Sequence, residues 1–168
     1  MFYLIATVGR VGNLPWMPGT FGSLAGLLFL FTLNWFGATS VSLAILTVLM
    51  SVIGWYATQS VLKEQNFSDS DPSYIVIDEV AGMFTAAMVF SFYHPITPIH
   101  LILIFILFRF FDILKPWPIG WIDRRLAEQP STASLGVMLD DIAAGIATAI
   151  VLLLFSFVFS GSCPFCGM

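Results

Sequence analysis

Five acidic residues lie inside or at the rim of strongly apolar segments, where a carboxylate is costly to place. They form three groups along the chain: Asp78 with Glu79, Asp112, and Asp140 with Asp141. Ionisable residues in apolar membrane segments are functional by default, and clustered carboxylates repel one another unless a cation or a proton lies between them. Carboxylate oxygens are ligands that Mg²⁺ prefers. We therefore predict that all five residues bind a divalent metal ion.

Two structural roles could instead account for single members of this set. An aspartate near a helix N-terminus is favoured by the helix dipole and by free N–H groups, which would explain Asp78 or Asp140. An ion pair at a spacing of three residues, with Arg109 or Lys115, would explain Asp112. Neither role accounts for all five acids, so metal binding is the stronger interpretation.

The pattern Asp-x-x-Ala-Gly occurs twice, in DEVAG (78–82) and in DIAAG (141–145). Residues three and four positions apart share one face of a helix, so the small residues lie one turn from each aspartate. Small residues let another helix or a lipid headgroup approach closely. The repeated pattern predicts a close approach beside two of the acids.

Five apolar segments must position these residues. The chain is 58% hydrophobic and 10% charged, with a mean hydropathy of +0.94, whereas a soluble domain carries roughly a quarter charged residues. Each segment supplies close to the ~20 helical residues that a ~30 Å hydrocarbon core demands, and helices satisfy their own backbone hydrogen bonds in lipid. The segments are residues 21–36, 41–62, 75–93, 97–115 and 139–159.

This pattern predicts an all-α fold, a small polytopic bundle of about five transmembrane helices. Residues 12–23 (GNLPWMPGTFGS) are rich in Pro and Gly and are expected to form a loop or a re-entrant segment before the first helix. A single membrane domain over residues 1–160 would carry a short tail at 161–168. That tail contains a CxxC pair, Cys163 and Cys166, which is too small for a closed zinc site within one chain.

The basic residues indicate the orientation of the bundle. With five spans, the long connections at 1–20, 63–74 and 116–138 share one side, whereas the short connections carry no Lys or Arg. Excess Lys and Arg marks the cytoplasmic side, so the N-terminus is predicted to be cytoplasmic and the C-terminus periplasmic. The long connections and their rim hold Arg10, Lys63, Lys115, Arg124 and Arg125.

All ten acidic residues fall on the same predicted side as the basic ones. Five of them lie in loops and are interpreted as a solvated surface: Glu64, Asp69, Asp71, Asp123 and Glu128. The total of six Lys and Arg residues is too small for the basic face that binds nucleic acid.

Several residues near this side could bind an anion. Thr20 and Ser23 lie at the start of the first apolar segment, and a helix N-terminus there would suit an anion, although an ordinary turn with a helix cap explains them equally well. Lys115 lies three residues from Asp112 at the same rim and is the better phosphate ligand. Arg124 could contact the same group or serve only to orient the bundle.

Four motifs in this order resemble those of the phosphatidylglycerophosphatase A family: PWMPGTFGSLAGL, IVIDEVAGM, FRFFDILKPWPIGWID and GVMLDDIAAGI. The resemblance extends from about Gly12 to Ala149. It implies a bacterial inner-membrane enzyme that requires Mg²⁺ and removes the terminal phosphate of phosphatidylglycerophosphate to yield phosphatidylglycerol. It also implies that the acids and the lysine of these motifs are catalytic: Asp78, Glu79, Asp112, Lys115, Asp140 and Asp141.

The residues and the resemblance together predict one mechanism. The carboxylates would hold one or two Mg²⁺ ions at the cytoplasmic interface, where an activated water attacks phosphorus. Lys115, helped by Arg10 or Arg124, would stabilise charge on the phosphate oxygens. Asp140 or Glu79 would accept the proton of the water. The acyl chains of the lipid substrate would stay in the bilayer.

Other membrane functions fit the sequence less well. A lipid phosphatase with a histidine nucleophile is excluded, because His94 and His100 fall at the interface opposite to the basic residues. A CDP-alcohol phosphotransferase would carry D-G-x-x-A-R, and DDIAAG has no such arginine. A small divalent cation transporter would hold its acids near mid-span rather than at one rim.

Overall fold

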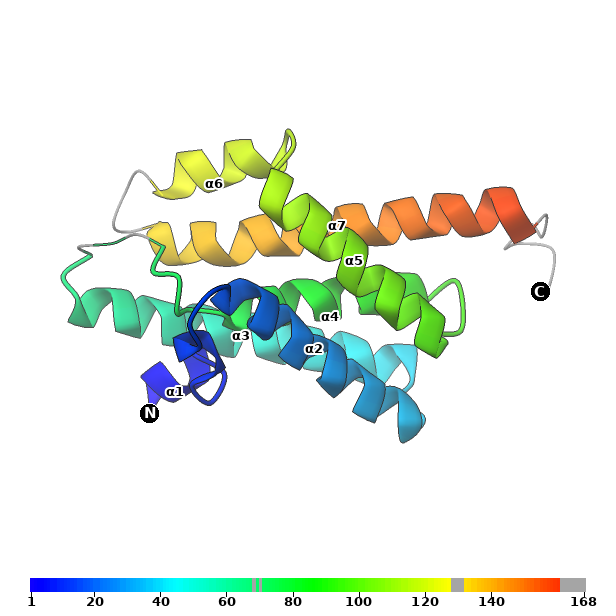
Figure 1. Ribbon diagram of the computed structural model, residues 1–168, viewed down its shortest axis with the longest axis horizontal. Helices are drawn as coiled ribbons and strands as arrows, with labels where there is room; N and C mark the ends of the chain where they lie inside the picture. The colour runs from blue at the N-terminus through cyan, green and yellow to red at the C-terminus, as the bar shows by residue number, and fades with distance from the viewer. Residues whose placement is uncertain (68, 70, 128–131, 161–168) are drawn as a thin grey trace.

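The computed structural model describes residues 1–67, 69, 71–127 and 132–160, and this part of the chain is helical without strands (Figure 1). A 3₁₀ turn, η1 (Val11–Asn13), follows the first helix. The α-helices are α1 (Phe2–Ala6), α2 (Pro18–Trp35), α3 (Ser40–Glu64), α4 (Ile77–Ser91), α5 (Pro98–Leu114), α6 (Ile119–Ala127) and α7 (Ala133–Ser160). The all-α prediction is therefore confirmed for these residues.

Each of the five apolar segments forms one long helix, and the boundaries agree to within a few residues except at two places. Helix α7 begins at Ala133, six residues before the predicted start, because the preceding turns bury apolar side chains such as Val137 and Met138. Helix α2 begins at Pro18, a residue that suits the first helical position because it has no N–H to leave unpaired. The prediction of a loop over 12–23 is therefore wrong for residues 18–23.

The two ends of α5 are both defined by local contacts. Thr97 caps its start: His100 Nδ1 accepts the Thr97 backbone N–H at 3.2 Å, and Pro98 follows as the first helical residue. Its end is marked by Lys115, which has a left-handed backbone with φ of 40°. Such a residue cannot continue a right-handed helix, so the chain turns there and leaves Lys115 at the end of α5.

Helix α4 is the centre of the bundle. Twelve of its 15 residues are buried, and it contacts α2, α3, α5 and α7, the last most extensively. A Cβ atom on Gly145 of α7 would collide with the Gly82 carbonyl oxygen, and one on Gly82 would lie 2.7 Å from the Asp141 carbonyl oxygen. The predicted close approach beside the two aspartates is therefore confirmed, and the approaching partner is a helix.

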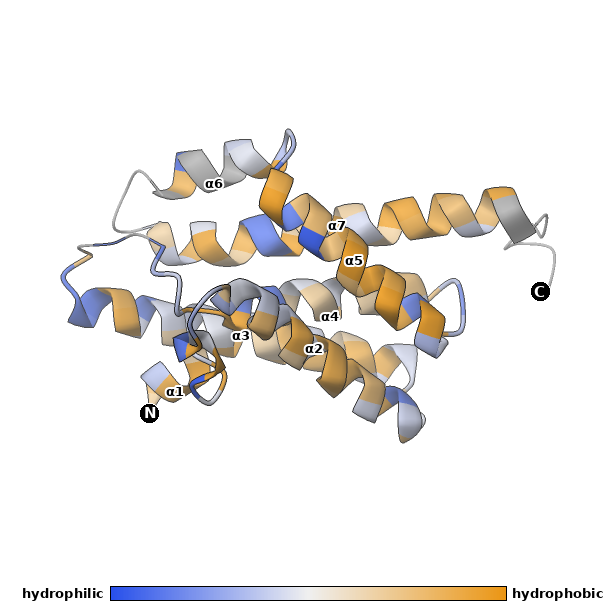
Figure 2. Cartoon of the chain, in the orientation of Figure 1, coloured by the Kyte–Doolittle hydropathy of each residue, from blue (hydrophilic) through white to orange (hydrophobic). Residues whose placement is uncertain are grey.

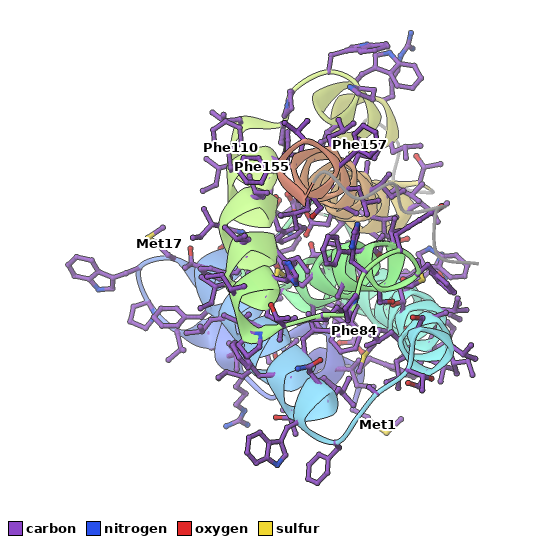
Figure 3. The ribbon with its side chains drawn as sticks, turned by 90° about the vertical axis from the view of Figure 1, so that its right-hand side faces the viewer. Met1, Met17, Phe84, Phe110, Phe155 and Phe157 are labelled. Carbon is purple, nitrogen blue, oxygen red and sulfur yellow. The ribbon has the colours of Figure 1, made fainter. Side chains whose placement is uncertain are left out.

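The core and the outer surface of the bundle are both apolar. Phe84 lies among the helices, whereas Phe110 and Phe157 project from the outside (Figure 3). Hydrophobic residues also cover the outer faces of α2, α5 and α7 (Figure 2). A bundle that exposes large apolar side chains while burying carboxylates is compatible with a membrane environment.

Two helices in the described part of the chain are long and apolar enough to cross a membrane: α3 and the segment Ala133–Val158 of α7. Helices α4 and α5 have 15 and 17 residues and reach only about 22–26 Å at 1.5 Å per residue, less than a ~30 Å hydrocarbon core. The connection from α1 to α2 and helix α6 lie toward one end of the bundle, and the short turns lie toward the other (Figure 1). The arrangement of five spans stays a prediction.

Candidate functional site

A cleft of about 440 Å³ opens where the starts of α2 and α4 meet the end of α5 and the first turns of α7. Its polar lining consists of carboxylates and two cationic side chains: Asp71, Asp78, Glu79, Asp112, Asp140, Asp141, Arg109 and Lys115. All five acids that the sequence singled out therefore lie in one cleft, together with Lys115. The helices bring them together from positions up to 63 residues apart along the chain, Asp78 to Asp141.

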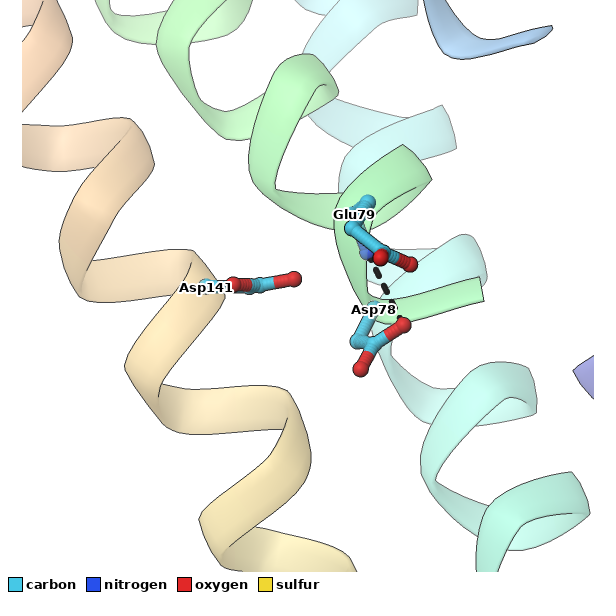
Figure 4. Close-up of side chains that lie close together, drawn as sticks. All are labelled: Asp78, Glu79 and Asp141. Atoms are coloured by element: carbon cyan, nitrogen blue, oxygen red, sulfur yellow. Dashed lines mark hydrogen bonds between the residues drawn. The ribbon is translucent and has the colours of Figure 1, made fainter. Parts of the chain in front are cut away.

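Three of these carboxylates form a compact buried group. Asp78, Glu79 and Asp141 are 7%, 9% and 4% exposed, and one oxygen of each lies within 4.8 Å of the others. Asp141 projects from α7 toward the start of α4, where the other two lie (Figure 4). Three buried anionic groups at this spacing repel one another unless a cation or a proton joins them.

The donor atoms of this group suit a divalent cation. Glu79 Oε2 is fully buried and accepts no hydrogen bond within the described residues, so a ligand is needed to satisfy it. Carboxylate oxygens are hard donors, which Mg²⁺ and Ca²⁺ prefer to soft metals. Asp78, Glu79 and Asp141 therefore fit a divalent metal ion, and their chemistry does not choose among the hard cations.

Local backbone contacts fix the paired acids. Asp78 Oδ1 accepts the Glu79 N–H at 3.0 Å (Figure 4), and Asp140 Oδ1 accepts the Asp141 N–H at the same distance. Asp78 and Glu79 lie in the first turn of α4, where unpaired N–H groups and the helix dipole favour negative charge. In each pair the first carboxylate is held against the backbone, which restricts its rotation.

The other two predicted acids each contact a cation. Lys115 Nζ lies 2.6 Å from Asp140 Oδ2, and Arg109 Nη1 forms an ion pair with Asp112 Oδ2. Of the two partners considered for Asp112 from sequence, Arg109 is the one observed. Lys115 instead reaches across to α7. Of the five predicted acids, three are thus grouped together and two neutralise the cationic side chains.

The start of α2 closes one wall of the cleft. A Cβ on Gly22 would lie 2.6 Å from Val76 Cβ and 3.2 Å from Glu79 Oε2, so only glycine lets α2 come this close to α4. Ser23 is fully buried in the same turn. Its hydroxyl donates to the Gly19 carbonyl oxygen at 2.9 Å and accepts from Arg109 Nη1 at 3.4 Å.

The residues predicted to bind substrate are distributed differently. Lys115 lines the cleft, and Ser23 lies behind Arg109 without lining it. Thr20 and Arg10 are not among the lining residues; Arg10 is exposed beside η1, where its N–H donates to Thr7 Oγ1 at 3.0 Å. Arg124 belongs to α6, and its side chain lies outside the described residues.

Two charged residues of the cleft were not predicted as site residues from sequence. Arg109 was set aside as a basic residue inside an apolar segment, although a charged residue there, three positions before Asp112, was itself a signal. Asp71 was interpreted as solvated surface; it is exposed, but it lines the cleft mouth. No local feature separates Asp71 from Asp69, because the path of the loop decides which of them faces the cleft.

Comparison with known proteins places the chain in a family. The family model for phosphatidylglycerophosphatase A matches residues 4–156. The Escherichia coli (strain K12) phosphatidylglycerophosphatase A is 32% identical over 152 residues, which cover 90% of this chain and 81% of that protein. The corresponding Haemophilus influenzae protein is 34% identical over 150 residues, 89% of this chain and 85% of that protein. No solved structure matches.

The match covers the helices except for the first two residues of α1 and the last four of α7, and it includes every residue that lines the cleft. Its length and the identity of both relatives are sufficient to assign the family. The chain belongs to the phosphatidylglycerophosphatase A family and is a phosphatase that hydrolyses a phosphate monoester.

Proposed function

We propose that the chain is a Mg²⁺-dependent lipid phosphatase that converts phosphatidylglycerophosphate to phosphatidylglycerol and inorganic phosphate at the cytoplasmic face of the bacterial inner membrane. One observation carries this proposal: three buried carboxylates lie in the same cleft as two cationic side chains. Carboxylates can hold a metal and cations can hold a phosphate. The names of the family and of both relatives support the lipid substrate.

Asp78, Glu79 and Asp141 would hold the metal ion. When bound, Mg²⁺ would neutralise charge on the phosphate and activate a water molecule. Asp112 and Asp140 were also predicted as ligands, and each of them contacts a cationic side chain. We therefore assign them mainly to holding these cations at the cleft, with the three buried acids as the principal ligands.

Lys115 and Asp140 would perform complementary tasks. Lys115 Nζ, at the end of α5, would donate to an oxygen of the terminal phosphate. As the phosphate takes over part of this contact, Asp140 Oδ2 becomes the acceptor for a proton of the attacking water. The new O–P bond forms while the P–O bond to the glycerol breaks, and the glycerol oxygen takes up a proton. Phosphatidylglycerol and inorganic phosphate leave.

The membrane arrangement follows from the same features. We propose that α2, α3, α4, α5 and α7 all span the bilayer, with the cleft toward the end that carries the long connections. Those connections and the last turn of α3 contain the basic residues outside α5, which mark the cytoplasmic side. The terminal phosphate would enter the cleft at headgroup depth, while the acyl chains remain beside the apolar outer surfaces of the helices.

The direct test is phosphate release from phosphatidylglycerophosphate micelles by the purified protein in detergent. We expect release with Mg²⁺, loss of release with EDTA, and recovery when Mg²⁺ is added in excess. Asp141→Asn should lower kcat by at least about a hundred-fold, because it removes a charged ligand beside the reacting group. Glu64→Gln is the matched control, because Glu64 is an exposed acid at the end of α3, away from the cleft.

Near-normal turnover by Asp141→Asn, or full activity in EDTA, would overturn this proposal. Cation uptake into liposomes without phosphate release would indicate the transporter considered from sequence. Transfer of a phosphoalcohol without phosphate release would indicate an enzyme like the CDP-alcohol phosphotransferases.

A further inference from the structure

We propose that Arg109 binds the phosphate group of the substrate and that Ser23 and Asp112 hold its guanidinium in place for this purpose. The inference rests on the proposed function of the same cleft and deepens it, because it adds Arg109 as a second phosphate-binding residue beside Lys115.

The guanidinium of Arg109 is anchored on one side only. Its Nη1 atom donates both to Asp112 Oδ2, one turn further along α5, and to Ser23 Oγ on α2 at 3.4 Å. The Ser23 hydroxyl donates its own proton to the Gly19 carbonyl oxygen at 2.9 Å. Its oxygen is therefore oriented to accept, and two helices fix the position of Nη1.

The other two nitrogens of the guanidinium, Nη2 and Nε, have N–H groups that remain available to donate. Within the described residues, Nη2 makes no hydrogen bond and, unlike Nε, it is not among the fully buried atoms. Arg109 lines the cleft, and a Cβ on Gly19, another lining residue, would lie 3.5 Å from Nη2. We therefore take Nη2 as the donor available to a group bound there. Nε is buried and has no acceptor among the described residues, which leaves an unsatisfied charged donor beside the cleft.

Gly19 explains why this side of the guanidinium stays accessible. A Cβ atom on Gly19 would lie 3.3 Å from Nη1 and 3.5 Å from Nη2 of Arg109, and it would collide with Glu79 Oε1. Any larger residue at the start of α2 would therefore push the guanidinium and Glu79 apart. With glycine at position 19, the Arg109 guanidinium and the Glu79 carboxylate stay close enough for a phosphate and its metal ion to contact both.

Charge neutralisation alone does not require an arginine. Asp112 and the three buried acids would be neutralised equally well by an ammonium group, which acts as a point charge. The planar guanidinium differs because it presents parallel N–H donors that match two oxygens of a phosphate. A guanidinium anchored through one nitrogen and open at another is suited to that geometry.

Three variants test this role, with Mg²⁺ present throughout. Arg109→Lys keeps the positive charge but loses the parallel N–H donors of the guanidinium, and Arg109→Gln loses both. Ser23→Ala removes the hydroxyl on α2 that accepts from Arg109 Nη1. We expect Arg109→Lys to raise KM and the inhibition constant of inorganic phosphate by about ten-fold or more, which is the effect of losing a charge-assisted hydrogen bond. Ser23→Ala should raise both by roughly two- to ten-fold and change kcat much less.

Arg125→Gln is the matched control. Arg125 is an exposed arginine on α6 that lies over the Trp121 ring, outside the cleft, so its loss should leave KM and phosphate inhibition unchanged. The thermal unfolding midpoint of each variant separates binding from folding. If Arg109→Gln does not fold, the KM values and phosphate inhibition constants of Arg109→Lys and Ser23→Ala still test the role of Arg109.

If Arg109→Lys binds inorganic phosphate as tightly as the wild type, Arg109 serves only to neutralise charge and the inference is overturned. Equal weakening by Arg125→Gln would do the same. Binding of inorganic phosphate, followed by ³¹P line broadening, keeps this test apart from the proposed function. If the wild type does not hydrolyse phosphatidylglycerophosphate but its phosphate binding still depends on Arg109, the function fails and this inference stands.

Discussion

At the scale of single residues, the site contains carboxylates that repel one another when no cation is bound. Asp78, Glu79 and Asp141 bring three carboxylates within 4.8 Å of one another at 9% exposure or less. Their repulsion works against the folded state when no cation is bound. Natural sites tolerate such a cost when activity depends on it.

Because of this repulsion, we expect Asp141→Asn to raise the stability of the metal-free protein and to weaken its metal binding. In EDTA, Asp141→Asn should unfold at a higher temperature than the wild type, because one of three facing charges is removed. With Mg²⁺ the wild type should gain stability, by about 2.7 kcal/mol at a concentration one hundred times Kd, and the variant should gain much less. Thermal unfolding followed by tryptophan fluorescence in detergent measures both.

Asp69→Asn is the control for this experiment, since Asp69 is exposed in the loop between α3 and α4 and is not among the residues lining the cleft. It should change neither midpoint. An Mg²⁺-dependent gain in Asp141→Asn as large as that of the wild type would show that Asp141 is not a ligand.

At the scale of elements, the site depends on how closely α4 and α7 approach. The contact is made by Gly82 and Gly145, one turn beyond the catalytic candidates Asp78 and Asp141 on their helices. Close packing through small residues is how helices associate in lipid, where no hydrophobic force drives them together. The same approach sets the distance between the carboxylates on the two helices.

Gly145→Ala should therefore both destabilise the protein and impair the site. The added Cβ collides with the Gly82 carbonyl oxygen, a backbone atom that moves only with its helix. We expect a loss of about 1–3 kcal/mol, the usual cost of an overpacked core, and weaker metal binding. Gly26→Ala is the comparison, because its Cβ would lie 3.3 Å from Met83 Cβ and 3.4 Å from Val80 Cα, so that the neighbouring helix need give only a few tenths of an ångström. A loss for Gly26→Ala equal to that for Gly145→Ala would contradict this account.

At the scale of the whole molecule, the two ends of the bundle differ in composition. The connection from α1 to α2, with Arg10, and helix α6, with Arg124 and Arg125, lie toward one end, whereas the short turns at 36–39 and 92–97, which carry no Lys or Arg, lie toward the other (Figure 1). The charge asymmetry predicts that only the second end is accessible from outside the cell membrane.

Single cysteines test this orientation in a chain whose own Cys163 and Cys166 are replaced by serine. Tyr93→Cys, at an exposed position in the turn after α4, should react with a membrane-impermeant maleimide in intact spheroplasts. Asp69→Cys, in the connection from α3 to α4, should react only after permeabilisation. Labelling of both positions in intact spheroplasts would contradict five spans with a cytoplasmic cleft.

The positions of the five long helices and of the acids along them could be predicted from sequence, whereas α1 and α6 lie in segments that were predicted as connections. Apolar runs define five helices because burial and backbone pairing depend on neighbouring residues. The Asp-x-x-Ala-Gly repeats predicted a close approach of a helix or a headgroup beside Asp78 and Asp141, because helical spacing places those residues on one face; the structure shows that α4 and α7 approach each other there. The start of α2 at Pro18 was missed because a segment rich in Pro and Gly is also typical of a loop.

The sequence by itself determined that the chain is all-helical, that its carboxylates gather toward one rim of the bundle, and that it resembles a phosphatase family. Only the tertiary structure decided that Lys115 pairs with Asp140, that Arg109 lies between Asp112 and Ser23, and that Asp71 reaches the cleft. The reason is physical. Hydropathy and spacing are local properties of a helix, whereas a partner on another helix depends on the rotation and depth of both, which packing through residues such as Gly22 and Gly82 sets.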